Sequence, residues 1–320
     1  MNVVSIILIL FAAKMGINSI NQFIIRPNKL KMELKKYSNT DMIKVIDLPD
    51  ELYEGNDLDV KENVVYQKVY STFCKFIEDK IHREDLDNYY RNFKTLKEYN
   101  ESTGYIFNHL RRGYISGGTY NSKENTIDLA TTPISELYNS ICHELLHASS
   151  TRLDLKNDVI YSGLSQVQIN KKDESKALVH GIGINEGLTQ YYANKFFDPR
   201  CQLIPAYSVY EEEQAIARLL EIIIGKEKLQ SLYFRADLNG LINELLKYAS
   251  KEDIYKFIKY TDVLFYYSSE KQLKFRELDE VKTYINTFLI NAYNNSLKAK
   301  NVDLTKVNGL SNDYLPYRRI

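Results

Sequence analysis

The sequence predicts an α+β protein that is predominantly helical. Apolar residues recur at helical spacing through most of the chain after Tyr207. Two short β-prone runs, 114–116 and 126–130, flank a connection rich in Gly, Asn and Ser. A helix pattern from Ile134 through Leu146 follows the second run directly. We therefore expect a small sheet beside a helix, followed by a helical C-terminal lobe.

The composition argues against a nucleic-acid partner and favours a reducing compartment. A chain of 320 residues with 44% hydrophobic residues can bury a large core. Lys plus Arg and Asp plus Glu number 42 each, so no net charge favours a nucleic acid, and we expect no nucleic-acid partner. The cysteines, Cys74, Cys142 and Cys201, are widely spaced and form no CxxC pair. This pattern argues against a disulfide framework and fits a reducing compartment.

The N-terminal run VVSIILILFAA, residues 3–13, is apolar and about as long as the hydrophobic part of a secretion signal. No Lys or Arg precedes it, and Lys14 ends it well short of a membrane span. A buried strand or helix, a membrane-associated anchor and a cleaved signal all stay open. We expect a cytoplasmic protein, with membrane association through residues 3–13 as an alternative.

The sequence ICHELLHASS, residues 141–150, places His143 and His147 one turn apart on the predicted helix. Their Cβ atoms would lie about 5–6 Å apart on one face, which lets two imidazoles share one zinc ion. Glu144 stands beside them, where a carboxylate can take a proton from a metal-activated water. If the histidines were merely structural, this apolar helix would bury two imidazoles at a cost. The pattern therefore predicts a zinc site.

A zinc site of this kind needs a third protein ligand. The metzincin continuation HExxHxxGxxH fails, because Ser150 stands at its Gly position and Leu153 at its third His. After a polar stretch from Asp154 to Glu174, the sequence GINEGLTQYY offers Glu186 on the next predicted helix. The alternative for Glu186 is a surface carboxylate near a helix start, where the helix dipole favours it.

HELLH followed by NEGLTQYY resembles the gluzincin metallopeptidases, the clan of thermolysin-like and aminopeptidase-like enzymes. The matching positions are Asn185, Glu186, Gly187, Thr189 and Tyr191. The resemblance covers roughly residues 111–200. It implies a zincin-like fold, zinc as the cofactor held by His143, His147 and Glu186, and Glu144 as the general base.

Two departures from the gluzincin pattern are visible. Thermolysin-like enzymes place an Asp four residues after the ligand Glu to hold a zinc-binding histidine, and this chain has Gln190 there. A glutamine can still orient an imidazole through a hydrogen bond. The GxMEN-type sequence that aminopeptidases carry before HExxH is missing. The resemblance therefore does not extend to cleavage at free amino termini.

The remaining roles concern the substrate. The run 126–130 occupies the place of the zincin edge strand, which pairs with an extended substrate, so we expect a peptide or protein as substrate. A Tyr or His near the metal generally stabilises the oxyanion. The candidates, in order, are Tyr210, Tyr207, His180 and Tyr191.

We expect a zinc-dependent metallopeptidase with four regions. They are an apolar N-terminal segment (1–30), a helical region (31–110) with helical spacing of apolar residues such as Val65 and Val69, a zincin catalytic core (111–200) and a helical lobe (201–320). Two alternatives remain: a catalytically inactive zincin fold that binds a protein partner, and a zinc hydrolase of another amide or ester. The sequence does not indicate an oligomeric state.

Overall fold

The structure, a computed structural model, is mostly helical with small sheets. It describes residues 75, 77, 78, 98–101, 118–122, 126–129, 134–154, 157–169, 178–196, 210–268, 276–302, 315 and 316. Helix accounts for 69% of this part, which confirms the α+β, predominantly helical class. The predicted helical pattern at Val65 and Val69 and the whole of region 1–30 lie outside the described residues.

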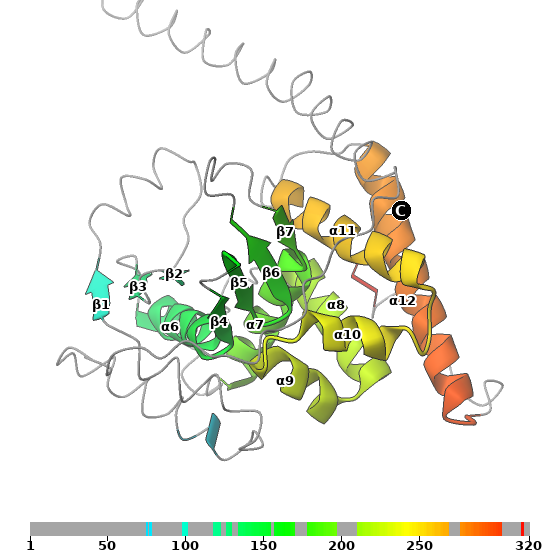
Figure 1. The fold of residues 1–320 in the computed structure, drawn as a ribbon, viewed down its shortest axis with the longest axis horizontal. Coiled ribbons are helices and arrows are strands. Elements are labelled where there is room, and N and C mark those ends of the chain that lie inside the picture. Colours follow the sequence, from blue (N-terminus) through cyan, green and yellow to red (C-terminus); the bar gives the residue numbers. More distant parts are fainter. Residues whose placement is uncertain are drawn as a thin grey trace, which may run out of the picture.

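The described strands form two sheets (Figure 1). The first has the order β1 (Glu98–Glu101), β3 (Thr126–Leu129), β2 (Gly118–Asn121). The second is a meander of β4 (Thr151–Asp154), β5 (Val159–Ser162), β6 (Ser165–Gln168) and β7 (Leu178–His180). All pairs are antiparallel except β1 with β3, which is parallel.

The meander was not predicted, because the part of the chain that forms its two middle strands was interpreted only as a polar stretch. Two of its strands, β5 and β6, lie between Asp154 and Glu174. They are joined by the two residues Gly163 and Leu164, and Gly163 has the positive φ of 51° that favours glycine in a tight turn. The signal that could have found the hairpin is this Gly between two short β-prone runs.

The expected edge strand at 126–130 needs a correction. Thr126–Leu129 (β3) is the central strand of its sheet, and its backbone groups are committed to β1 on one side and β2 on the other. The strands at the two edges of the described sheet are β1 and Gly118–Asn121 (β2). The other predicted β-prone run, 114–116, lies outside the described residues.

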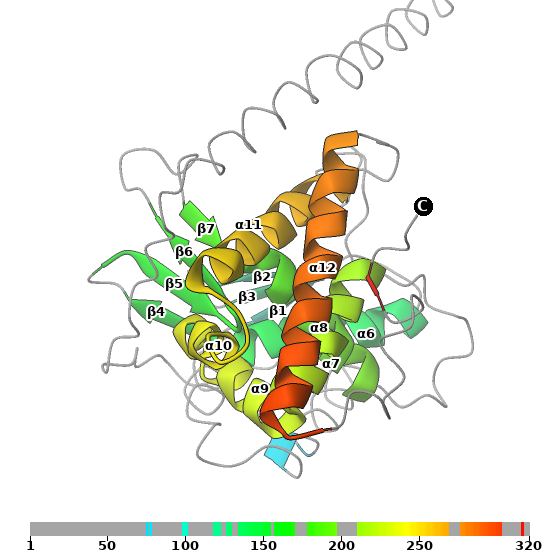
Figure 2. The same ribbon diagram turned by 90° about the vertical axis from the view of Figure 1, so that its right-hand side faces the viewer.

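Seven helices are described from residue 134 onward. They are α6 (Ile134–Ser149), α7 (Ile182–Phe196), α8 (Glu211–Ile224), α9 (Lys226–Phe234), α10 (Leu238–Leu245), α11 (Lys251–Ser268) and α12 (Arg276–Ala299). Figures 1 and 2 both show the long helix α12 to the right of the meander. The predicted helices around HELLH and NEGLTQYY and through the C-terminal lobe are therefore confirmed.

Helix α7 is the centre of the packing, since it contacts α6, α8 and α11. Two glycines let its neighbours approach closely. A Cβ on Gly183 would lie 2.5 Å from the carbonyl oxygen of Thr261 in α11, and one on Gly187 would overlap the carbonyl of Glu213 in α8. Glycine normally weakens a helix interior. Here it allows α7 to sit among three partners.

The expected localisation is corrected. We expected a cytoplasmic protein with a membrane association through residues 3–13 as an alternative. Within the part of the chain that the structure describes, none of the helices combines the length and the apolar character needed to cross a bilayer. Residues 3–13 themselves lie outside that part. The described residues thus include no helix that could span a membrane, and the expectation is not retained.

Candidate metal centre

Helix α6 carries the HELLH motif in its buried C-terminal part. Every residue from Ile141 to Ser150 is buried, including His143 and His147. Hydroxyl groups close the end of the helix: Ser150 Oγ donates to the carbonyl of Leu146 at 2.8 Å, and Thr151 Oγ1 donates to that of His147 at 2.7 Å. These bonds satisfy carbonyls that a helix end leaves without partners. They also fix the backbone that carries His147.

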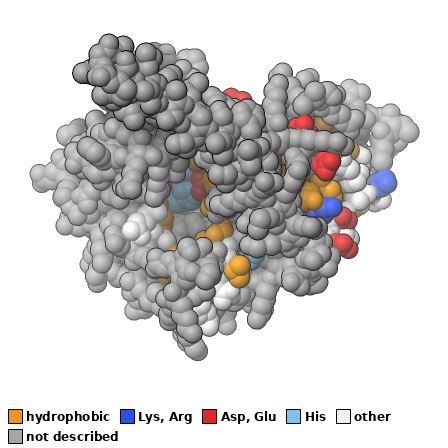
Figure 3. Space-filling view, turned by 90° about the horizontal axis from the view of Figure 1, so that it is seen from above, with side chains coloured by type: hydrophobic (Ala, Val, Ile, Leu, Met, Phe, Trp, Pro, Cys, Tyr) orange, Lys and Arg blue, Asp and Glu red, His pale blue; other side chains and the backbone are white. Residues whose placement is uncertain are grey.

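The structure brings the three predicted ligands together. His143 Nε2 lies 3.3 Å from Glu186 Oε2, and His147 Nε2 lies 3.3 Å from Glu186 Oε1. The two Nε2 atoms are 3.0 Å apart. One ligand atom from each residue falls within 4.8 Å of the others. Histidine side chains with an acidic group beside them are visible in a recess in Figure 3.

The charge of Glu186 suits a metal ligand. Burial raises the pKa of its carboxyl, but the imidazoles of His147 and His143 outweigh burial and bring the pKa below its usual range. The carboxylate is therefore ionised at neutral pH. Two imidazole nitrogens and one carboxylate oxygen are the donor set of many catalytic zinc sites. The residues present fit zinc.

Side-chain amides lie at the outer nitrogens of both histidines. His143 Nδ1 is 3.0 Å from Gln190 Oε1, and His147 Nδ1 is 3.5 Å from Asn185 Nδ2. Asn185 Oδ1 also accepts the N–H of Leu164, from the turn between β5 and β6. An acceptor at Nδ1, such as Gln190 Oε1, sets the direction of a ligand imidazole, whereas the amide nitrogen of Asn185 can only donate. Gln190 thus occupies the orienting place expected from the sequence.

Glu144 lies beside the three-residue cluster and is not a member of it. The pKa of Glu144 is raised to about 7, chiefly by burial and further by the charge of Glu186. The charge of His143 and a hydrogen bond from the backbone N–H of Tyr120 act in the opposite direction and lower this pKa. Tyr120 belongs to β2, so an edge strand of the first sheet reaches the site. A carboxyl with a pKa near 7 can both take and give a proton at neutral pH.

Glu186 lies on α7, and a carboxylate from another helix holds the first turn of α7. Asp262 of α11 accepts the N–H of Gly181 at 2.8 Å through Oδ2 and the N–H of Gly183 at 3.0 Å through Oδ1. Helix starts leave such N–H groups without partners. Asp262 supplies the missing acceptors across the α7–α11 contact. No local pattern in the sequence indicates this role of Asp262, because Asp262 and its partners are far apart in the chain.

Of the oxyanion candidates, the structure brings Tyr210 to the cluster. Its ring centroid lies 6.3 Å from that of His143 and 5.6 Å from that of Phe265. Tyr210 precedes α8 with a φ of 60°, in the left-handed region that non-glycine residues rarely adopt. Such strain persists only where surrounding structure imposes it. Tyr207 lies outside the described residues.

The other two oxyanion candidates, Tyr191 and His180, have other recorded neighbours. The hydroxyl of Tyr191 donates to Glu221 of α8 at 3.4 Å and accepts from Lys195 at 3.2 Å. His180 lies in β7, where burial and then the charge of Lys259 lower its pKa to about 4. His180 is not among the three residues that cluster within the described part of the chain.

Comparison with protein-family models, with curated proteins and with solved structures found no match. The likeness to gluzincins therefore rests on the HELLH and NEGLTQYY sequences and on the geometry that brings His143, His147 and Glu186 together.

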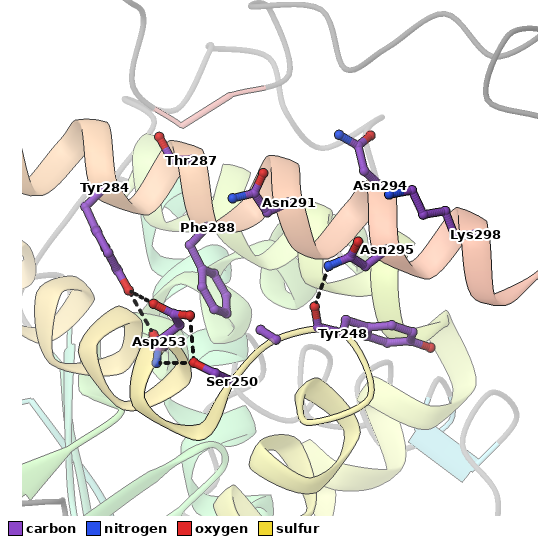
Figure 4. A pocket seen from close by; sticks show the side chains of 11 residues that line it. Tyr248, Ser250, Asp253, Tyr284, Thr287, Phe288, Asn291, Asn294, Asn295 and Lys298 are labelled. Atoms are coloured by element: carbon purple, nitrogen blue, oxygen red, sulfur yellow. Dashed lines mark hydrogen bonds between the residues drawn. The ribbon is translucent and has the colours of Figure 1, made fainter.

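A second concavity, of about 640 Å³, lies between the start of α11 and α12 (Figure 4). Its lining residues include neither His nor Cys, and several of its polar groups bond to each other. Asp253 accepts from Ser250 at 2.7 Å and from Tyr284 at 3.0 Å, and Asn295 donates to the carbonyl of Tyr248 at 2.8 Å. These bonds cap α11 and tie it to α12, a structural role.

Asp262→Ala should lower the free energy of unfolding by about 1–3 kcal/mol, because two buried N–H groups at the start of α7 lose their acceptors. Chemical denaturation followed by circular dichroism measures this. The control is Asp279→Ala on the exposed side of α12, which should change stability by less than about 0.5 kcal/mol. Equal effects of the two substitutions would contradict the role of Asp262.

Proposed function

We propose that this protein is a zinc-dependent metallopeptidase of the gluzincin type with a zincin-like fold. The observation that carries the proposal is the convergence of His143, His147 and Glu186 from two helices, with side chains only 10%, 10% and 16% exposed. Helices α6 and α7 contact one another, and β2 contacts α6. This order of sheet strand, motif helix and ligand helix supports a zincin-like arrangement.

Each residue of the centre has a role in peptide-bond hydrolysis. Zinc held by His143, His147 and Glu186 would supply a Lewis acid for the substrate carbonyl and the attacking water. Glu144 would take a proton from that water and deliver it to the leaving amine. Tyr210 would donate a hydrogen bond to the oxyanion.

A peptide is the proposed substrate because the resemblance to gluzincins implies one. β2 pairs with β3 in the first sheet and contacts α6, the helix that carries Glu144. The N–H of Tyr120 bonds to Glu144, so a peptide along β2 would run past the proposed general base.

Glu144→Gln should retain zinc and reduce the rate of peptide cleavage by about 10²–10⁴-fold, since it removes proton transfer and leaves all three ligands in place. Zinc content and initial rates on a peptide library measure the two effects. Glu211→Gln, on the exposed start of α8, is the matched control and should cleave at the wild-type rate. A Glu144→Gln protein that cleaves as fast as wild type would refute the mechanism.

The same peptide library distinguishes a peptidase from the two alternatives, another zinc hydrolase and a protein-binding module. Zinc-loaded protein that hydrolyses small amides or esters but no peptide would indicate another hydrolase. Saturable binding of peptides without turnover would indicate a binding module.

Tyr210→Phe should lower kcat by about 10²-fold with little change in KM, because the hydroxyl acts on charge that develops in the transition state. Steady-state kinetics on a peptide cleaved by the wild type measure this. Tyr191→Phe removes a hydroxyl that is bound to Glu221 instead, and it should leave kcat unchanged. An unchanged kcat in Tyr210→Phe would show that another group stabilises the oxyanion.

A further inference from the structure

A network of four amide side chains lies behind His143. It joins three helices and consists of Asn139 of α6, Gln190 and Asn194 of α7, and Gln214 of α8. Gln190 Nε2 donates to Asn139 Oδ1 at 2.8 Å and to Asn194 Oδ1 at 3.0 Å. Asn139 Nδ2 donates to Asn194 Oδ1 at 2.9 Å, and Asn194 Nδ2 donates to Gln214 Oε1 at 2.8 Å.

The network determines which atom Gln190 presents to His143. An amide nitrogen has two N–H groups, and both N–H groups of Gln190 have an acceptor in the network. Turning over Gln190 alone would place its oxygen against the oxygens of Asn139 and Asn194. Gln190 is only 7% exposed, so water could not readily replace the lost bonds. Its carbonyl oxygen therefore faces His143.

A carbonyl oxygen accepts a hydrogen bond and cannot donate one. Nδ1 of His143, 3.0 Å from Gln190 Oε1, must then carry a hydrogen, and in the neutral imidazole this leaves the lone pair on Nε2. Nε2 is the atom that lies 3.3 Å from Glu186. The network thus selects the tautomer of His143 that can bind a metal through Nε2.

We propose that Gln190 is a positioning residue that orients the imidazole of His143. Asn139, Asn194 and Gln214 hold the amide of Gln190 in the orientation that this role needs. The inference rests on the proposed metal site. It assigns to a neutral amide network the task that an acidic residue performs in thermolysin-like enzymes. A neutral partner adds no negative charge behind the imidazole, so the bound metal keeps more of its positive charge as a Lewis acid.

Gln190→Leu should weaken zinc binding by about 10–100-fold, because Nδ1 of His143 loses its acceptor. Gln190→Glu keeps an acceptor for Nδ1 but sets an oxygen against those of Asn139 and Asn194. It should therefore bind zinc more weakly than wild type and more tightly than Gln190→Leu. The control, Gln230→Leu, makes the same change at a glutamine of equal exposure, 7%, on α9. It should leave zinc affinity unchanged. Competition with a chromophoric chelator measures all four proteins.

The inference is overturned if Gln190→Leu binds zinc as tightly as wild type, or if Gln190→Glu loses as much affinity as Gln190→Leu. In either case wild-type zinc binding would still stand, and the proposed function with it. A wild type that binds no zinc would instead remove the proposed function.

A second measurement needs no variant of Gln190. Long-range nitrogen NMR spectra of the chelator-treated protein identify the tautomer of each neutral histidine, and the chain has five. Loss of one signal in His143→Asn assigns the signal of His143. We expect its hydrogen on Nδ1. A hydrogen on Nε2 with none on Nδ1 would overturn the inference, whatever the zinc affinities are.

Discussion

The carboxylate of Glu186, held between two imidazoles, is the interaction on which the centre depends. A buried charge is costly unless it is paired or binds a metal. Each oxygen of Glu186 lies 3.3 Å from an imidazole nitrogen. The meander β4–β7 separates α6 from α7 in the chain, so packing alone must bring the carboxylate to the histidines. Glycines at the α7 contacts and the carboxylate of Asp262 serve that approach.

The parts of the site that lie on one helix could be predicted from the sequence. His143 and His147 share a helical face because they are four residues apart, and the structure places both in α6. The placement of Glu186 on the following helix came from the motif NEGLTQYY, and α7 contains it. The helical C-terminal lobe followed from its periodicity.

The parts that depend on contacts between distant segments could not be predicted. Tyr191 matches the gluzincin pattern, yet Glu221 of α8 determines where its hydroxyl points. Asn139 lies one turn before His143, a spacing that could have suggested a partner, but its bond to Gln190 depends on how α6 meets α7. The run 126–130 was correctly expected to form a strand, and its central place depends on β1, which no local pattern reveals.

Metal content after mild chelator challenge shows whether Glu186 is the third ligand of a metal centre. The measurement compares purified wild type with Glu186→Ala. We expect one zinc per chain in wild type and zinc lost or loosened in the variant. Zinc fully retained by Glu186→Ala would show that Glu186 is the wrong third ligand, and a metal-free wild type that cannot be reloaded would contradict the centre itself.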